Sequence, residues 1–145
     1  MRKLIITAAI AAGLMSTTGC GPQEDDMKDK TIEAAAAEAR ADIDALAALL
    51  GSSPEVRQDV ISDCVPGDDA SGKTLDYAVR VQVEPGTLGR LKTEVAEQYE
   101  ADGWQVKLDP GTNSVRFAKG SETIGARVFE DRGSAVVSGS GGCVK

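Results

Sequence analysis

TLDYAVRVQV, residues 74–83, is the part of the chain whose structure is most clearly specified by its residues. Its apolar positions alternate with polar or small ones, and they are Leu75, Tyr77, Val79, Val81 and Val83. A period of two residues is typical of a β-strand that buries one face and leaves the other in solvent. The stretch therefore predicts a half-buried strand, which needs neighbouring strands and a covering layer.

A second helix and several short strands are predicted after this strand. Pro85 and Gly86 indicate a turn, Thr87 is a suitable helix N-cap, and Gly103 ends the helix. The apolar face of the helix consists of Leu88, Leu91, Val95 and Tyr99. Shorter alternating segments bounded by turns follow at 104–108, 115–117, 124–128 and 135–137. Short turns join antiparallel strands, so these segments predict an antiparallel sheet.

A helix over residues 27–50 and a strand over residues 55–65 are predicted before the strand at residues 74–83. The helix carries apolar residues at spacings of three and four, at Ile32, Ala36, Ala39, Ile43, Leu46 and Leu50. Gly51 and Pro54 stop the helix. We expect the narrow, Ala-rich stripe to pack on the protein's own sheet, and presentation to a partner protein is the alternative. The strand is indicated by Val56, Val60, Ile61 and Val65.

The order of elements predicts an α+β fold. A helix, two strands, a second helix and four strands fit one antiparallel sheet of about five to six strands, with two helices packed on one face. We expect residues 30–145 to form this single domain, since the chain is long enough for one hydrophobic core.

Residues 1–19 have the pattern of a secretory signal. Arg2 and Lys3 precede an apolar run at 4–15, and small residues at 16–19 lead to Cys20. The run is too short for a stable transmembrane span. Residues 20–29 are polar and acidic and predict a short spacer before the domain.

The charge of the chain argues against nucleic acid as a partner. The sequence has 16 basic and 23 acidic residues, a net charge of -7. Loss of residues 1–19 would remove two of the basic residues and leave 14 − 23 = −9. Binding to phosphate backbones rests on clustered Lys and Arg, so an acidic chain of this kind predicts no nucleic-acid binding.

Cys64 and Cys143 are predicted to form a disulfide. The secretory signal implies an oxidising compartment, and these are the two cysteines that fall within the predicted domain. A metal site is the competing interpretation, but the sequence contains no His, and two thiols alone lack further soft ligands. We expect no cofactor and no metal.

Residues 67–74, GDDASGKT, match the spacing of a phosphate-binding loop. In such loops a helix opens directly after the Lys and Thr, whereas Lys73 and Thr74 lead into the alternating strand. Asp68 and Asp69 would also face the phosphates. The segment is therefore interpreted as a polar hairpin loop, with nucleotide binding as the alternative.

Other candidate sites are weak. Asp63, Asp68 and Asp69, and separately Asp109, Thr112 and Asn113, could offer oxygen ligands to calcium, but neither set has the spacing of a known calcium loop. They are interpreted as turn residues. The usual Ser-His or Cys-His relay is excluded because no His is present. Trp104 is interpreted as a core anchor, with ligand stacking as the alternative.

The sequence from the apolar run to Cys20 resembles the lipobox of bacterial lipoproteins. Together with the acidic spacer and the Cys64 and Cys143 pair, the layout is similar to small exported lipoproteins of high-GC Gram-positive bacteria, many of unknown function. The resemblance implies cleavage before Cys20, acylation of Cys20, and a lipid anchor on the extracytoplasmic face of the cell membrane. It implies no catalytic or ligand-binding residue.

The sequence therefore favours a non-enzymatic binding module beside the membrane, for an envelope protein or a small ligand. The open face of the sheet or the Ala-rich helix stripe would carry the binding. The alternative is a structural or accessory subunit of an envelope complex, and a more remote one is a carboxylate- or metal-dependent enzyme.

Overall fold

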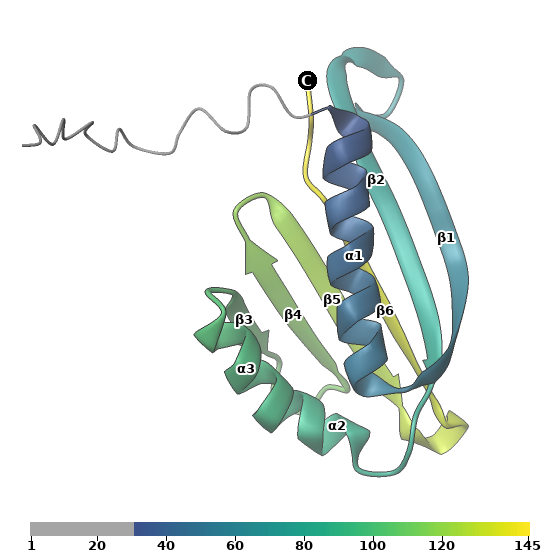
Figure 1. Ribbon diagram of the computed structural model, residues 1–145, viewed down its shortest axis with the longest axis vertical. Coiled ribbons are helices and arrows are strands. Elements are labelled where there is room, and N and C mark those ends of the chain that lie inside the picture. The colour runs from purple at the N-terminus through teal and green to yellow at the C-terminus, as the bar shows by residue number, and fades with distance from the viewer. Residues whose placement is uncertain (1–30) are drawn as a thin grey trace, which may run out of the picture.

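Residues 31–145 form one antiparallel sheet of six strands with helices on one side, as the computed structural model shows (Figure 1). The strand order is β1 (Ser52–Val65), β2 (Asp68–Gln82), β6 (Ser134–Ser140), β5 (Glu122–Phe129), β4 (Ser114–Lys119) and β3 (Gln105–Leu108). Every neighbouring pair is antiparallel. The α+β prediction is confirmed, and β1 and β3 are the two edges.

Helix α1 (Ile32–Leu50) packs on its own sheet. Its N-cap is Thr31, whose hydroxyl accepts a hydrogen bond of 3.3 Å from the backbone N–H of Ala34, so the helix begins later than the predicted Met27. The stripe is at most 1% exposed at Ala36, Ala39, Ile43, Leu46 and Leu50. A helix offers its apolar stripe to a partner only if the stripe is accessible, so that alternative is wrong for this surface.

The second helix consists of three continuous pieces, α2 (Thr87–Arg90), the π-helical segment η1 (Leu91–Val95) and α3 (Ala96–Ala101). Its predicted apolar face is confirmed, because Leu91, Val95 and Tyr99 are buried. The predicted N-cap is wrong. Thr87 lies inside the helix, its hydroxyl donates to the carbonyl of Glu84 (2.7 Å), and Gly86 is the N-cap.

The β1–β2 hairpin extends further than predicted. β1 begins at Ser52 and β2 at Asp68, so residues 66–67 alone form the turn. The strand prediction for residues 55–65 is confirmed, but its apolar side chains are 44–56% exposed: Val56, Val60, Ile61 and Val65. Because β1 is an edge strand, one of its sides has no neighbouring strand, and α1 lies mainly over β2 and β6.

Both helices cover the same face of the sheet (Figure 1). α1 lies over β2 and β6, and the second helix continues into β3 at the opposite edge. Phe117 of β4 joins the two halves of the core, because its ring centroid is 4.8 Å from that of Tyr99. Within residues 31–145, no helix or strand covers the other face of the sheet.

Candidate functional site

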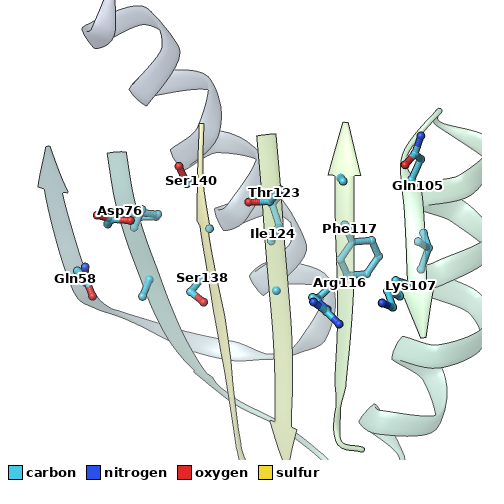
Figure 2. Close-up of a pocket in the computed structure, with 16 residues that line it drawn as sticks. Gln58, Asp76, Gln105, Lys107, Arg116, Phe117, Thr123, Ile124, Ser138 and Ser140 are labelled. Atoms are coloured by element: carbon cyan, nitrogen blue, oxygen red, sulfur yellow. The ribbon is translucent and has the colours of Figure 1, made fainter. Parts of the chain in front are cut away.

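The uncovered face of the sheet is hollowed into a groove. Strand alternation sets which residues line it: the Tyr77 hydroxyl donates to Asp44 of α1 (3.1 Å), so the adjacent Asp76 and Ala78 point to the opposite face. The hollow has a volume of about 730 Å³. Figure 2 shows its lining, which extends from Gln58 on β1 to Lys107 on β3. We call this surface the open-face groove.

The floor of the open-face groove is built from small side chains. They are Ala78, Ala118, Thr123, Gly125, Ser138 and Ser140. Gly125 lies near the middle, paired with Arg116 on one side and Ser138 on the other. A Cβ atom added at Gly125 would have its nearest neighbour at 3.9 Å, the backbone oxygen of Ser138. A side chain at this position could therefore be accommodated and would project into the groove.

Two cations, Lys107 and Arg116, line the β3–β5 end of the groove, and Arg127 lies beside them on the same face of the sheet, in an adjoining hollow. Lys107 lies directly opposite Arg116 in the β3–β4 register, and Arg127 follows Gly125 by two residues on the same face of β5. Arg116 also binds Asp109 (3.1 Å). Within residues 31–145, Lys107 and Arg127 make no ion pair. A second hollow of about 700 Å³ adjoins the groove and shares Arg116.

The β1–β2 end of the groove has the opposite character. Asp76 accepts a hydrogen bond from the hydroxyl of Ser62 (3.3 Å), and Gln58 extends the polar surface to the sheet edge. The groove therefore has a basic end over β3–β5 and an acidic and polar end over β1–β2, joined by a floor of small residues.

The predicted disulfide is confirmed. Cys64 of β1 and Cys143 near the C-terminus are bonded, with Cα atoms 5.8 Å apart. The backbone of Val144 also pairs with Lys73, through hydrogen bonds of 2.7 and 2.8 Å. The end of the chain is thus fixed to the hairpin that follows α1. Cys20, the predicted lipidation site, lies outside the described residues, as do residues 1–19 and the spacer at 20–29.

The residues that match a phosphate-binding loop lie in the β1–β2 hairpin. Lys73 is a strand residue, and its ammonium group donates to Asp63 and to Asp69 (3.1 Å). The hydroxyls of Thr74 and Ser140 are 2.8 Å apart. The segment lies in a hairpin, as interpreted, but only Gly67 is in the turn and residues 68–74 belong to strand β2 and not to a loop. A phosphate cradle needs a helix N-terminus after the loop, and β2 continues here instead.

The residues considered as calcium ligands have structural partners. Asp63 and Asp69 bind Lys73, Asp109 binds Arg116, and the amide of Asn113 donates to the carbonyl of Val128 (2.8 Å). Among residues 31–145, no three His, Cys, Asp or Glu side chains are grouped to hold a metal ion.

Trp104 belongs to the core, as interpreted. It is 8% exposed, and its ring centroid is 5.6 Å from that of Tyr99. The ammonium group of Lys119 lies 5.7 Å from the Trp104 ring and covers its outer side. A ring packed in this way has no free face on which a ligand could stack.

Glu122 is an unusual carboxylate at the start of β5, away from the groove floor. Its Oε1 atom is buried and has no hydrogen-bond partner among residues 31–145. Burial, and after it the nearby carboxylates of Asp42 and Glu38, raise the pKa of Glu122 to about 7, against a lowering effect of Lys119. Glu122 is therefore partly protonated near neutral pH in the folded protein.

Replacing Glu122 by Gln is expected to remove a pH dependence of stability. Between pH 4.5 and about 7 the folded protein keeps a proton that the unfolded chain has lost, so wild-type stability falls as pH rises through this window. At pH 8 we expect E122Q to be more stable by about 1–2 kcal/mol, a value reduced for the partial exposure of the group. Urea unfolding at pH 4.5 and pH 8 measures this difference.

The control for this prediction is E97Q, at an exposed position of α3. E97Q should keep the wild-type pH profile. A profile of E122Q that falls between pH 4.5 and pH 7 as steeply as the wild-type profile would contradict the assignment to Glu122.

The cluster of cationic residues on the open face of the sheet was not identified from the sequence. Lys107, Arg116 and Arg127 each stand between two apolar residues of a strand, so alternation alone places each on the polar face. These three side chains are close together because of the strand order β5-β4-β3 and the pairing register of these strands. The apolar pattern of a single strand predicts neither.

No helix of residues 31–145 has the length and apolar character needed to cross a membrane. Comparison with known proteins gave no relative: no protein-family model matches the chain, and neither the curated proteins nor the solved structures contain a match. The functional proposal therefore rests on the residues and their geometry.

Proposed function

We propose that the protein is a lipid-anchored, extracytoplasmic membrane protein that acts as a non-enzymatic binding module, and that the open-face groove is its binding surface. The observation that carries the proposal is the groove itself. It is a hollow of about 730 Å³ on the bare face of a sheet whose other face carries the hydrophobic core. Concave surfaces with a few polar groups are the usual ligand sites of proteins.

The chemistry of the groove supports binding over nucleophilic catalysis. Among residues 31–145, none of the hydroxyls of Thr123, Ser138 and Ser140 is hydrogen-bonded to a carboxylate or to an amine side chain. A hydroxyl nucleophile needs such a base to be activated at neutral pH. The sequence has no His to serve in that role. Arg116, Arg127 and Lys107 are cations that bind and orient a ligand.

Two further observations support an extracytoplasmic, membrane-anchored location for the protein. The pattern of residues 1–20 resembles a lipoprotein signal that ends at Cys20. The Cys64–Cys143 disulfide fits an oxidising compartment, because such bonds are rare where thiols are kept reduced. An anchor at Cys20 would hold the domain beside the membrane, with the groove open to envelope components.

The exposed edge of strand β1 supports the alternative function, in which the protein is a structural or accessory subunit of an envelope complex. Its outer edge has no neighbouring strand among residues 31–145, and Val56, Val60 and Ile61 are 44–56% exposed. Exposed apolar strand edges commonly serve as pairing or docking surfaces. In that case β1, and not the groove, would carry the contact.

Photo-crosslinking in intact cells tests the proposal. A photoreactive residue at Thr123, on the groove floor, is expected to capture a discrete envelope component. Adding G125L to the same protein should abolish the capture, because the new side chain projects into the groove and meets no atom closer than 3.9 Å at its Cβ. Circular dichroism should show that G125L keeps the fold.

The matched control is a photoreactive residue at Glu97, on the exposed face of α3, which should give no G125L-sensitive product. Mass spectrometry of the Cys20 peptide from the same cells tests the anchor. An unmodified Cys20 would contradict the lipid anchor, and an unchanged Thr123 product in G125L would contradict the groove as the binding surface. A product obtained only from Ile61 of β1, which is paired with the buried Leu75 and therefore lies on the face away from the groove, would support the accessory subunit.

A further inference from the structure

We propose that the ligand of the open-face groove is an extended polypeptide segment with an acidic end and a neutral or basic end, and that its acidic end binds over Gly125 between Arg116 and Arg127. This inference rests on the proposed function and specifies its ligand class. It is carried by the unequal distribution of charge along the groove and by the empty position at Gly125.

Gly125 is surrounded by groups that bind a carboxylate. Arg116 and Ser138 flank it on the neighbouring strands, about 5 Å away at the strand spacing of a sheet, and Arg127 lies about 7 Å further along the same face. No side chain occupies the centre of this arrangement. Arginine side chains bind carboxylates through paired, charge-assisted hydrogen bonds, and the Ser138 hydroxyl can donate another.

Like charges lie next to each other at the cationic end of the groove. Lys107 and Arg116 are directly opposite each other on β3 and β4, an arrangement in which like charges repel. Asp109 binds Arg116 alone, and Arg127 brings a third positive charge on the diagonal. In a chain with a net charge of -7, three clustered cations next to an empty position indicate an anionic ligand group.

The opposite end of the groove limits how much negative charge the ligand carries. Asp76 lies two strands from Gly125 on the same face, across β6. A uniformly anionic polymer that reached Asp76 would be repelled there. A segment that is acidic only over β4 and β5, and neutral or basic over β1 and β2, matches both ends. The charge pattern therefore favours a polypeptide over a polyphosphate or an anionic glycopolymer.

The dimensions of the groove fit a chain segment better than a small molecule. The groove crosses all six strands, from Gln58 to Lys107, a span of roughly 24 Å at about 4.8 Å between strands. About seven extended residues cover that distance at about 3.3–3.4 Å each. The floor of Ala, Gly and Ser lets a backbone approach closely, and the Gln, Ser and Thr side chains can pair with its amides.

Fluorescence anisotropy with labelled nine-residue peptides tests this assignment on the full chain in nonionic detergent. The probe, which we call the bipolar peptide, has three Glu at one end and two Lys at the other. One comparison peptide is all-acidic, and the other is a scramble of the same composition as the probe. We expect the bipolar peptide to bind at least about fivefold more tightly than either, with an affinity that falls as salt is added. Equal affinities for the three peptides would overturn the proposal.

The charge-reversal variant K107E separates a binding role from a structural one. It places a carboxylate opposite Arg116, so the fold should become as stable or slightly more stable while the bipolar peptide binds about tenfold more weakly. K145E makes the same charge change near the C-terminus, outside the groove, and should leave binding within about twofold. Unchanged binding in K107E would contradict the assignment of the cationic end.

The outcomes distinguish this inference from the proposed function. If the Thr123 cross-link forms and is lost in G125L but none of the peptides binds, the groove is a binding surface and the ligand class is wrong. If inorganic phosphate at millimolar concentration displaces the bipolar peptide, the cations form a simple anion site, and the polypeptide assignment is overturned. If the Thr123 cross-link does not form, the groove itself is not the binding surface.

Discussion

Replacing Cys64 and Cys143 together by Ala is expected to lower the free energy of unfolding by about 4.5 kcal/mol. The two cysteines are separated by 79 residues, and a cross-link that closes a loop of this length removes that much chain entropy from the unfolded state. The bond joins β1 to the tail beyond β6, so it spans nearly all of the sheet in sequence. Loss of this amount is a large share of the stability of a domain of this size.

Denaturant unfolding of the double variant, beside the wild type with and without a reducing agent, measures the effect. The reduced wild type should match the double variant, because both lack the same constraint. The hydrogen bonds between Val144 and Lys73 should not hold the tail alone, and hydrogen exchange of the Val144 amide is expected to become fast. A loss below about 1 kcal/mol would show that the unfolded chain is already restricted by other structure.

Replacing Phe117 by Ala is expected to lower the free energy of unfolding by about 3–5 kcal/mol. Phe117 is 1% exposed and is among the largest fully buried side chains of the described domain. Its ring packs against Tyr99, with centroids 4.8 Å apart, and thereby attaches the second helix to β4. Truncation leaves a cavity that the surrounding strands cannot close, because their backbones are fixed by the sheet ladder.

The control for this prediction is F129A, which makes the same chemical change at a half-buried site. Phe129 is near the end of β5, and its ring lies 5.6 Å from the guanidinium carbon of Arg132. The expected loss is about 1 kcal/mol, because much less apolar surface leaves contact with the protein. Thermal unfolding followed at the Tyr and Trp absorption bands compares the two. A loss for F117A no larger than that for F129A would contradict the position of Phe117 at the centre of the core.

The two faces of the sheet are expected to have different roles. The helix side holds the large buried side chains, and the open side holds small residues and unsatisfied charge. Changes such as G125L or K107E on the open side are therefore expected to alter binding with little loss of stability, whereas changes such as F117A alter stability first.

The sequence determined the elements of this fold because their signals are local. Each apolar pattern indicates which side of one element is buried. These patterns are the alternation of residues 74–83, the stripe from Ile32 to Leu50 and the face from Leu88 to Tyr99. Short turns then require antiparallel neighbours. The disulfide followed from cysteine count and compartment. Element boundaries at Thr31, Ser52 and Asp68 were missed, since they depend on hydrogen bonds made outside the apolar pattern.

Only the tertiary structure decided which polar residues meet. Alternation put Lys107, Arg116 and Arg127 on the polar faces of three strands. The pairing register brought Lys107 and Arg116 together at one end of the groove, with Gly125 beside Arg116 and Arg127 two residues further along the same strand. It also placed the apolar residues of β1 at an exposed edge. Strand order and register arise from long-range backbone pairing and from the docking of α1 over β2 and β6. The apolar pattern of a segment does not indicate which distant segments it will contact.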